Sequence, residues 1–447
     1  MACGGASHGE RVIVVEPAGG QGSDLPQSPS GAGPIGLGGE PGTGAAGEGG
    51  AGDAGGAGGV ASAEPCHAAT ENTVGNLQLV SLSMTCGAAD GDAAFSRLTA
   101  DGRYVAFDSD AGDLTPNDRN GKSDAFLFDL QTRALELISQ HYEEARPADG
   151  YTFLPMASTD GRYVAFTSYS YELTEQLPPE GTWIYVRDRQ TGTTRRLAAT
   201  FACAYWLDMT PDAGTLVADG FSNCTGGIED GDHDTAVAYQ RDTGEATYLG
   251  ADDGGDNYRP SISADGRFMV WGTRPPGTRG QFTTRMQHYD RETDTLQTLP
   301  LLGFHFGSID LADSGKIVAF SLTGQVYRYD VETMELTLVS RNASGGNGDG
   351  ASDPVSISAD GRFVVFASTA NDLVDGDTNG ASDVFLYDAE QDSLERISLA
   401  PDGSQADEAS RRPHISADGT HITFVSKARN LLPVATAGNW QVYVLTR

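Results

Sequence analysis

The sequence has no long hydrophobic run and little positive charge, and both absences narrow the classes of protein that it can encode. No segment approaches the roughly 18 consecutive apolar residues of a transmembrane helix, so we expect no such helix. The 447 residues include 62 acidic and 29 basic side chains, which gives a net charge of −33. Such a surface repels phosphate backbones and anionic lipid headgroups, so we expect neither nucleic acid nor bare membrane as a partner.

Sequence motifs that mark catalytic centres are also missing. No H-E-x-x-H segment occurs, residues 77–447 contain no G-x-S-x-G segment, and the eight His residues are scattered along the chain. The five cysteines form no C-x-x-C pair and no Cys/His cluster with the spacing of zinc ligands. We therefore predict that the protein is not an enzyme, although catalytic residues that converge from distant segments would leave no such motif.

Four of the cysteines form two pairs that are close in sequence, Cys66 with Cys86 and Cys203 with Cys224. We predict two disulfides in an oxidising compartment, with four unlinked thiols as the alternative. The remaining Cys3 follows Met-Ala and precedes Gly-Gly, which resembles the cleavage site of bacterial lipoproteins. The charged and apolar parts of that signal are absent, so we expect the true start to lie upstream. Otherwise Cys3 is an ordinary exposed thiol.

Residues 1–63 have almost no apolar periodicity, and Gly dominates residues 18–63. Such a segment cannot bury enough surface to offset its ordering entropy, so we predict a disordered tether. Behind a lipidated Cys3, the tether would hold a folded domain, residues 64–447, away from a membrane. We expect an exported protein that is either a lipoprotein anchored in the outer membrane or a periplasmic or extracellular protein.

From Leu77 onward the chain repeats itself, and this is the strongest signal in the sequence. An Asp-Gly-type turn followed by an apolar run recurs about every 50 residues. The seven turns begin at Asp101, Asp160, Asp212, Asp265, Asp313, Asp360 and Asp418. The sixth repeat predicts four strands, at residues 355–358, 362–368, 383–388 and 394–398. Four antiparallel strands repeated radially are typical of a β-propeller blade, with an open stack or a sandwich array as the alternative.

The two ends of the repeat region indicate a closed ring. The seventh repeat predicts three strands, at 414–416, 420–426 and 441–445, and lacks the fourth. Residues 77–83 have the character of a fourth strand and precede the first repeat. Pairing them with the last strand would complete the seventh sheet and remove two exposed edges. We therefore predict an all-β protein with seven four-stranded blades, closed by residues 77–83.

The repeat also resembles a known family. Ser-Ala-Asp-Gly-Arg-Phe at 358–363, followed by an apolar run and by Asp-Val-Phe-Leu-Tyr-Asp at 383–388, is similar to the TolB-like propeller repeat of bacterial envelope proteins. The resemblance covers residues 77–447 and implies a propeller fold. It implies no single function, because some members are binding platforms and others are fused to hydrolase domains.

One loop of the sixth repeat has the pattern of a calcium site. Counting from Asp375, oxygen-bearing side chains stand at positions 1, 3, 5 and 9, with Gly380 at position 6. The four predicted ligands are Asp375, Asp377, Asn379 and Asp383. The pattern is similar to the calcium loops of integrin-type propellers, and we predict a structural Ca²⁺ ion. The alternative is a hydrogen-bonded Asx-turn loop without metal.

The first repeat carries a weaker copy of this loop. Asp118, Asn120 and Asp124 match the third, fifth and ninth positions, and Pro116 replaces the first Asp. We predict Ca²⁺ there as well, with less ligand support. Elsewhere, the tryptophans and Tyr205 lie in strand segments, where core packing is the expected role and sugar stacking is the alternative.

Two functions fit the sequence. The leading hypothesis is a monomeric binding or scaffolding propeller at a bacterial envelope, whose partner is an envelope protein or a glycan. The alternative is a glycan-active enzyme, a lyase or hydrolase, with its site at the propeller axis. Arg259-Pro260 and Arg412-Pro413 occupy equivalent places just before innermost strands. They either line the axial channel and meet an anion, or pair with acidic loops.

Overall fold

The computed structural model describes residues 13–14, 73–116, 118–178, 180–197, 203–221, 234–250, 255–278, 281, 283–303, 306–434, 436 and 438–447. The side chains of residues 13, 14, 203, 221 and 234 are outside this description. In these ranges every regular element is a β-strand, and no helix is long and apolar enough to cross a membrane.

The strands form seven sheets, each with the four antiparallel strands of one blade, and in six of these blades the four strands follow one another along the chain. Blade 1 consists of β4 (Ala93–Leu98), β5 (Tyr104–Ser109), β6 (Asp124–Asp129) and β7 (Leu135–Leu137). Blade 2 consists of β8 (Thr152–Ala157), β9 (Tyr163–Ser168), β10 (Trp183–Asp188) and β11 (Thr193–Arg196). Blade 3 consists of β12 (Cys203–Met209), β13 (Thr215–Phe221), β14 (Asp234–Gln240) and β15 (Ala246–Leu249).

The remaining blades have the same order, and two of them gain a strand. Blade 4 consists of β16 (Asp256–Ile262), β17 (Phe268–Arg274), β18 (Thr284–Asp290) and β19 (Thr295–Gly303). Blade 5 consists of β20 (Phe306–Leu311), β21 (Ile317–Leu322), β22 (Gln325–Asp330) and β23 (Glu335–Leu338). Blade 6 consists of β24 (Ser352–Ile357), β25 (Phe363–Ser368), β26 (Asp383–Asp388) and β27 (Ser393–Arg396). Blade 7 consists of β28 (Ser410–Ile415), β29 (His421–Ser426), β30 (Gln441–Thr446) and β3 (Leu77–Leu79).

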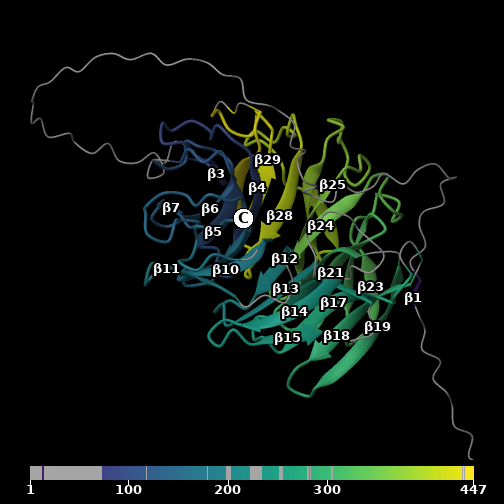
Figure 1. Ribbon diagram of the computed structural model, residues 1–447. Helices are drawn as coiled ribbons and strands as arrows, with labels where there is room; N and C mark the ends of the chain where they lie inside the picture. The colour runs from purple at the N-terminus through teal and green to yellow at the C-terminus, as the bar shows by residue number, and fades with distance from the viewer. Residues whose placement is uncertain are drawn as a thin grey trace, which may run out of the picture. The chain divides into compact units, whose positions relative to one another are not determined.

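The seven blades form a closed ring around a central axis. Each innermost strand contacts the innermost strand of the next blade, and β28 of the last blade contacts β4 of the first. Figure 1 shows β4, β12 and β28 near the centre and β7, β11 and β15 toward the rim. The predicted seven-bladed propeller is confirmed. One face of the ring carries the Asp-Gly turns, here called the turn face, and the other carries the long connecting loops, here called the loop face.

The ring closes through the segment that the sequence predicted. β3 pairs antiparallel with β30, and β2 (Thr73–Val74) pairs with the outer side of β3. Beyond β3, the Ser81 hydroxyl donates to Gln441 Oε1 at 2.7 Å, and Gln441 Nε2 donates to the Ala89 carbonyl. Ser340 with Gln325 makes the same contact inside blade 5. The N-terminal segment therefore takes the place of a fourth strand in detail.

In blades 1, 2, 4 and 6 a Ser/Thr-x-Asp-Gly-Arg phrase builds the turn between the first two strands through a fixed set of hydrogen bonds. In blade 2, the Ser158 hydroxyl and the Arg162 N–H both donate to Asp160, and Tyr163 N–H donates to Ser158 Oγ. The guanidinium of Arg162 then pairs in bidentate fashion with Asp188 at the end of the third strand. Equivalent pairs join Arg103 to Asp129, Arg267 to Asp290 and Arg362 to Asp388. The arginine of the phrase therefore links the turn between strands one and two to the turn between strands three and four.

A belt of hydrogen bonds joins the innermost strands near the turn face. In five blades the next-to-last residue of the innermost strand accepts a hydrogen bond. The donor is the backbone N–H of the last residue of the innermost strand in the following blade. The donor and acceptor pairs are Ile262 to Asp208, Leu311 to Ser261, Ile357 to Asp310, Ile415 to Ser356 and Leu98 to His414. Blades 1 and 2 carry Arg97 and Met156 at this position. Among the described residues the belt therefore runs from blade 3 to blade 1.

The core lies between neighbouring sheets, where strands two and three are buried on both faces. A stacked aromatic pair joins these two strands in five blades, with ring centroids 5.4 to 5.8 Å apart. The pairs are Phe107–Phe126, Phe166–Tyr185, Phe320–Tyr327, Phe366–Phe385 and Phe424–Tyr443. The nearly continuous apolar runs in the sequence correspond to these strands.

Two details differ from the expected strand pattern. The innermost strands of blades 6 and 7 begin at Ser352 and Ser410, several residues before the predicted starts, because each strand contains a bulge at its proline. In addition, β1 (Ile13–Val14), within the segment predicted to be a coil, pairs in parallel with Leu301 and Leu302 of β19. The predicted boundary between tether and folded domain stays a prediction.

The closure contact makes a prediction about stability. Gln441 is fully buried, and replacing it by Ala removes the acceptor of the Ser81 hydroxyl and the amide donor to the Ala89 carbonyl. We expect Gln441→Ala to lower the free energy of unfolding by about 1–3 kcal/mol, measured by urea denaturation. Gln190→Ala, on an exposed turn of blade 2, is the control and is expected to change it by less than about 0.5 kcal/mol. Equal effects in both variants would contradict the role of Gln441.

Candidate functional site

The innermost strands share a β-bulge that turns one short stretch of each blade toward the axis. The pairing register shifts once in each of the seven strands. The residues at these shifts include Phe95, Leu154, Tyr205, Arg259, Ser308, Asp353 and Arg412. Leu154, Arg259 and Arg412 have positive φ angles of 53° to 54°, an uncommon conformation for residues with side chains. Bulges re-aim side chains, and these lie on the loop-face side of the belt.

Arginines and aromatic rings from different blades meet at this level. Trp206 of blade 3 has the Arg259 guanidinium over its ring at 4.8 Å and the Arg97 guanidinium at 5.2 Å. Arg412 of blade 7 lies over Phe95 of blade 1, with 3.7 Å between the guanidinium carbon and the ring centroid. These contacts connect blades 1, 3, 4 and 7. They define the axial mouth as the cluster of Phe95, Arg97, Trp206, Arg259, Arg411 and Arg412.

Arg411 extends the mouth toward blade 7. Its guanidinium lies 3.6 Å from the centroid of the Trp440 ring, and the Lys427 amino group lies 5.2 Å from the same centroid. Arg411 Nε is buried without a hydrogen-bond partner among the described residues. The mouth thus presents basic groups that the surrounding protein does not fully satisfy.

Two buried carboxylates hold the bulges in place from behind. Asp108 accepts the Phe95 N–H at 2.6 Å, and Asp219 accepts the Arg259 N–H at 2.6 Å. Burial raises the pKa of Asp108 to about 7 and raises the pKa of Asp219, while the positive charges of Arg412 and Arg259 act in the opposite direction. In each case the second carboxylate oxygen has no hydrogen-bond partner among the described residues. The carboxylates hold the bulges, and when ionised they partly offset the positive charges of Arg412 and Arg259.

The positive charges of the mouth repel one another. Burial, followed by the charge of Arg411, lowers the pKa of Arg412 to about 10; Arg259 acts in the same direction, and Asp108 acts in the opposite one. The Arg412 guanidinium donates to the Ala94 carbonyl at 3.0 Å. The Arg259 guanidinium makes no hydrogen bond or ion pair with a described residue. Carboxylates lie near these arginines, and Asp108 and Asp353 partly oppose the lowering of the Arg412 pKa, but none of the described carboxylates forms an ion pair with Arg259, Arg411 or Arg412.

At the lower edge of the mouth, the Arg97 side chain reaches acidic groups of the belt. The Arg97 guanidinium reaches across blade 2 to Asp208 of blade 3, 3.5 Å away. Burial, with a smaller effect from the Asp208 charge, raises the pKa of Asp310 to about 7. Burial and the nearby Arg97 lower the pKa of His414 to about 3, so the ring is neutral. This neutral ring accepts the Leu98 N–H at Nδ1.

The predicted calcium loop of the sixth blade is bound to its own side chains. Asn379 Nδ2 donates to Asp383 at 2.8 Å, and the Arg396 guanidinium lies 3.0 Å from Asp377 and 3.6 Å from Asp383. Asp375 is exposed. A guanidinium from the fourth strand therefore occupies the place next to two of the predicted ligands. The calcium prediction for this loop stays a prediction.

The first-blade loop has the same amide contact and lacks the arginine. Asn120 Nδ2 donates to Asp124 at 2.8 Å, and Leu137 stands where blade 6 has Arg396. Burial raises the pKa of Asp118 to about 6 and that of Asp124 to about 7. In the described part of the chain, no three His, Cys, Asp or Glu side chains are grouped so that they could hold a metal ion. Calcium in this loop also stays a prediction.

Several other predicted site residues cannot be placed. Cys3, Cys66 and Cys224 lie outside the described residues, as does the side chain of Cys203, so lipidation and both disulfide pairings stay predictions. Among the aromatic residues, Trp271 is buried as expected. Trp206 differs from this expectation, because it lies in the mouth, where its indole N–H donates to the Pro260 carbonyl.

Sequence reasoning identified only part of the mouth. It named Arg259 and Arg412 as possible channel residues, and both lie there. It missed Arg97, Arg411 and the two carboxylates, because they come from separate blades and have no shared motif. The available signal was the difference from the belt pattern: Arg97 stands where other blades place an acceptor.

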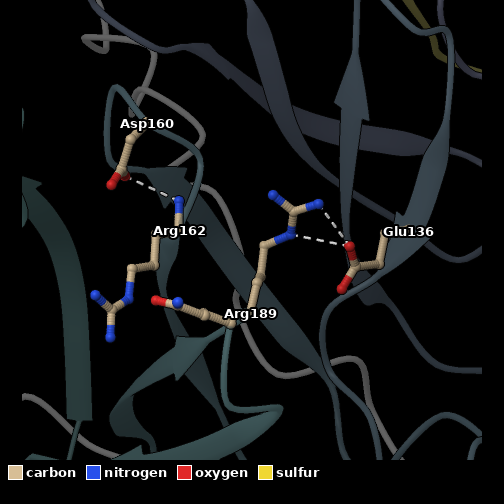
Figure 2. A pocket seen from close by; sticks show the side chains of 5 residues that line it. Glu136, Asp160, Arg162 and Arg189 are labelled. Atoms are coloured by element: carbon tan, nitrogen blue, oxygen red, sulfur yellow. Dashed lines mark hydrogen bonds and ion pairs between the residues drawn. The ribbon is translucent and has the colours of Figure 1, made fainter.

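Two hollows on the turn face are poorer candidates. One has a volume of about 390 Å³ and is lined by Glu136, Asp160, Arg162, Arg189 and Gln190. Figure 2 shows Arg189 turned toward Glu136, and the two are 2.7 Å apart. The other, of about 540 Å³, lies at the turns around Asp212 and Arg241. The charged groups of the first hollow already have partners within the repeated turns, so it offers little to a ligand.

Comparison with known proteins establishes the fold. No protein-family model matches the chain, and no curated protein sequence does. The chain is similar to the oligogalacturonate lyase of Vibrio parahaemolyticus, with 14% identity and a TM-score of 0.53 over 83% of this chain and 93% of that one. An oligogalacturonate lyase in complex with manganese gives 13% identity and a TM-score of 0.53, over 83% of this chain and 92% of that one. A prolyl endopeptidase gives 10% identity and a TM-score of 0.52, over 83% of this chain and 50% of that one. At these identities the likeness extends to the β-propeller alone.

The sixth-blade loop gives a prediction about metal binding. Arg396 supplies positive charge beside Asp377 and Asp383, so a calcium ion would have to displace it. We expect Arg396→Gln to bind Ca²⁺ more tightly than the wild type, measured by calorimetric titration. Asp377→Ala in the Arg396→Gln background should abolish the gain. Identical binding isotherms for the wild type and Arg396→Gln would contradict this interpretation.

The buried Asp310 gives a prediction about pH. Its folded pKa of about 7 lies above the value of about 3.9 in an unfolded chain, so ionisation destabilises the fold. This penalty is absent below about pH 4 and grows as the pH rises to about 7. Asp310→Asn should therefore be more stable relative to the wild type at pH 8 than at pH 4, by up to roughly 4 kcal/mol.

Urea denaturation at several pH values measures this difference. Gln190→Ala, which changes no titratable group, is the control and should show no such trend. A stability difference between Asp310→Asn and the wild type that does not change with pH would contradict the raised pKa.

Proposed function

We propose that the protein is a binding propeller whose axial mouth takes an anionic glycan, such as an oligosaccharide of uronic acids. The observation that carries the proposal is the group of arginines at the mouth, Arg97, Arg259, Arg411 and Arg412, which lie against aromatic rings. Guanidinium groups bind carboxylates in bidentate fashion, and the mutual repulsion at Arg412 would be relieved by an anion. The Arg259 guanidinium makes no ion pair with a described residue, so it is available to bind a carboxylate of the ligand.

The aromatic rings favour a sugar over a simple inorganic anion. Phe95 and Trp206 are half-buried and come from the first and third blades, while the arginines of blades 4 and 7 face them. A uronate has both chemistries, because its ring carries apolar C–H faces and its substituent is a carboxylate. The axis of a closed ring of rigid strands also suits a small ligand.

Cleavage of the same ligand is the second candidate function. Asp108, with a pKa of about 7, lies close to Arg412 and is a carboxyl group suited to proton transfer near neutral pH. Two of the solved structures with this fold are oligogalacturonate lyases. Binding is the primary proposal, because Asp108 is fully buried behind the Phe95 bulge.

The setting of the protein is part of the proposal. The resemblance to TolB-like repeats supports a place at a bacterial envelope, with lipidated Cys3 as the anchor and disulfides Cys66–Cys86 and Cys203–Cys224 formed on export. Calcium in the loops of blades 1 and 6 would stiffen the loop face. In this setting the mouth would capture an extracellular or wall-derived glycan.

The test is a titration with oligogalacturonate by calorimetry. We expect wild type to bind, and Arg411→Gln and Arg259→Gln each to lose about tenfold or more in affinity, because each removes a charge-assisted hydrogen bond. Lys316→Gln removes the same charge from the turn face and should bind as the wild type does. A matched neutral oligosaccharide should bind weakly or not at all.

Three outcomes separate the possibilities. Absence of binding by the wild type would sink the proposal. Equal losses in Lys316→Gln and Arg411→Gln would show that only net charge matters, which contradicts a built site. Appearance of unsaturated sugar ends, followed by ultraviolet absorbance, would replace binding by the lyase function.

A further inference from the structure

A group of exposed aromatic side chains lies on the loop face of blade 2. Tyr151 and Tyr169 are 37% and 43% exposed, although large aromatic side chains usually bury most of their surface. The Phe153 ring lies between them, stacked on Tyr151 with 9° between the planes and edge-on to Tyr169, both at 6.1 Å between centroids. We call Tyr151, Phe153 and Tyr169 the blade 2 platform. An exposed aromatic cluster of this kind is typical of a binding surface.

A single positive charge accompanies the platform. The amino group of Lys122, from the loop before β6, lies 4.3 Å from the centroid of the Tyr151 ring. It makes no ion pair with a described residue. Because the chain has 62 acidic and 29 basic residues, a lysine held over an aromatic ring without a carboxylate partner is unusual.

The platform is held in a fixed geometry. Tyr169 N–H and the Ser168 hydroxyl both donate to the Tyr151 carbonyl at 3.0 Å. Thr152 N–H donates to the Ser123 carbonyl of blade 1 at 2.7 Å, next to Lys122 in the sequence. Tyr151 and Lys122 are thus positioned by backbone contacts before any ligand arrives, which lowers the entropy cost of binding.

The platform is built on a strand between two strands that carry mouth residues. Phe153 lies on β8, where it is followed by Leu154, the bulge residue of blade 2. In the ring, β8 lies between β4, which carries Phe95, and β12, which carries Trp206. A chain of sugars bound at the mouth can therefore continue over blade 2 without leaving the loop face.

We propose that the blade 2 platform is a second sugar subsite, so that the ligand is an oligosaccharide with at least two uronate rings. This inference rests on the proposed function of the mouth. The apolar faces of a sugar ring stack on Tyr151 and Tyr169, and the ammonium group of Lys122 pairs with the carboxylate of that ring. The arginines of the mouth hold the carboxylate of the preceding ring.

The charge of the platform decides among its possible occupants. A neutral glycan would use the rings and leave Lys122 without a partner, whereas a polyuronate uses both. A second copy of this acidic chain would have to bring its own excess of negative charge to the loop face. Self-association is nevertheless a measurable outcome of the test.

The experiment compares galacturonic acid with its tetramer in calorimetric titrations. The wild type should bind the tetramer more tightly than the monomer. Tyr151→Ala and Tyr169→Ala should each reduce the advantage of the tetramer by about three- to tenfold and leave the affinity for the monomer unchanged. Lys122→Gln should reduce the advantage and its dependence on salt. Tyr248→Ala, 55% exposed on β15 at the outer edge of blade 3, is the matched control and should behave as the wild type does.

The outcomes distinguish this inference from the proposed function. If the wild type binds neither sugar, the proposed function fails. If the wild type binds both and Tyr151→Ala keeps the full advantage of the tetramer, the platform inference is wrong and the mouth remains. A change of oligomeric state in the platform variants alone, measured by sedimentation velocity, would assign the platform to contact between copies and overturn the inference. Lys122→Gln preserves the aromatic packing, so it tests the subsite even if a tyrosine variant unfolds.

Discussion

Closure of the ring is the constraint on which the rest of the structure depends. Seven sheets around an axis leave two unpaired edges unless the first and last segments of the repeat region meet, and here β3 pairs with β30. The contact between Ser81 and Gln441 repeats one that blade 5 makes within a single repeat, so the junction is chemically the same as a continuous blade. Once the ring is closed, the innermost strands cannot move apart independently. Their relative positions then fix the geometry of the axial mouth.

The mouth occurs where the regular pattern is interrupted. Five blades supply a polar acceptor to the belt. The two exceptions, Arg97 and Met156, lie in consecutive blades, blade 1 and blade 2. Because Met156 offers no acceptor, Arg97 can reach across blade 2 to Asp208 and Trp206. The bulges act in the same direction, since they give Arg259 and Arg412 a backbone conformation that a regular strand does not allow. The site therefore uses local departures from the repeat, supported by Asp108 and Asp219, which bind the bulge N–H groups from behind.

Loops that look alike in sequence differ in their chemistry. The loops of blades 1 and 6 share the amide contact from Asn to Asp, yet only blade 6 places an arginine beside it. That arginine, Arg396, belongs to the fourth strand and lies outside the loop whose spacing suggested a cation. Loop spacing alone could therefore not decide between a metal ion and a guanidinium. The same limit applies to the bulges. A proline normally lies at the end of a strand or in an edge strand, so the pattern predicted strands that start after Pro354 and Pro413. In the structure both prolines lie in bulges within their strands.

The sequence by itself determined the number of blades, the order of strands in each and the segment that closes the ring. It could do so because turn chemistry and alternation of apolar residues are local properties, written within a few residues and repeated seven times. Only the tertiary structure decided which arginines share the mouth, which carboxylates stand behind them and that Phe153 packs with Tyr151 and Tyr169. Those contacts join residues from different blades, and their distances depend on the radius and closure of the ring, which no local segment encodes.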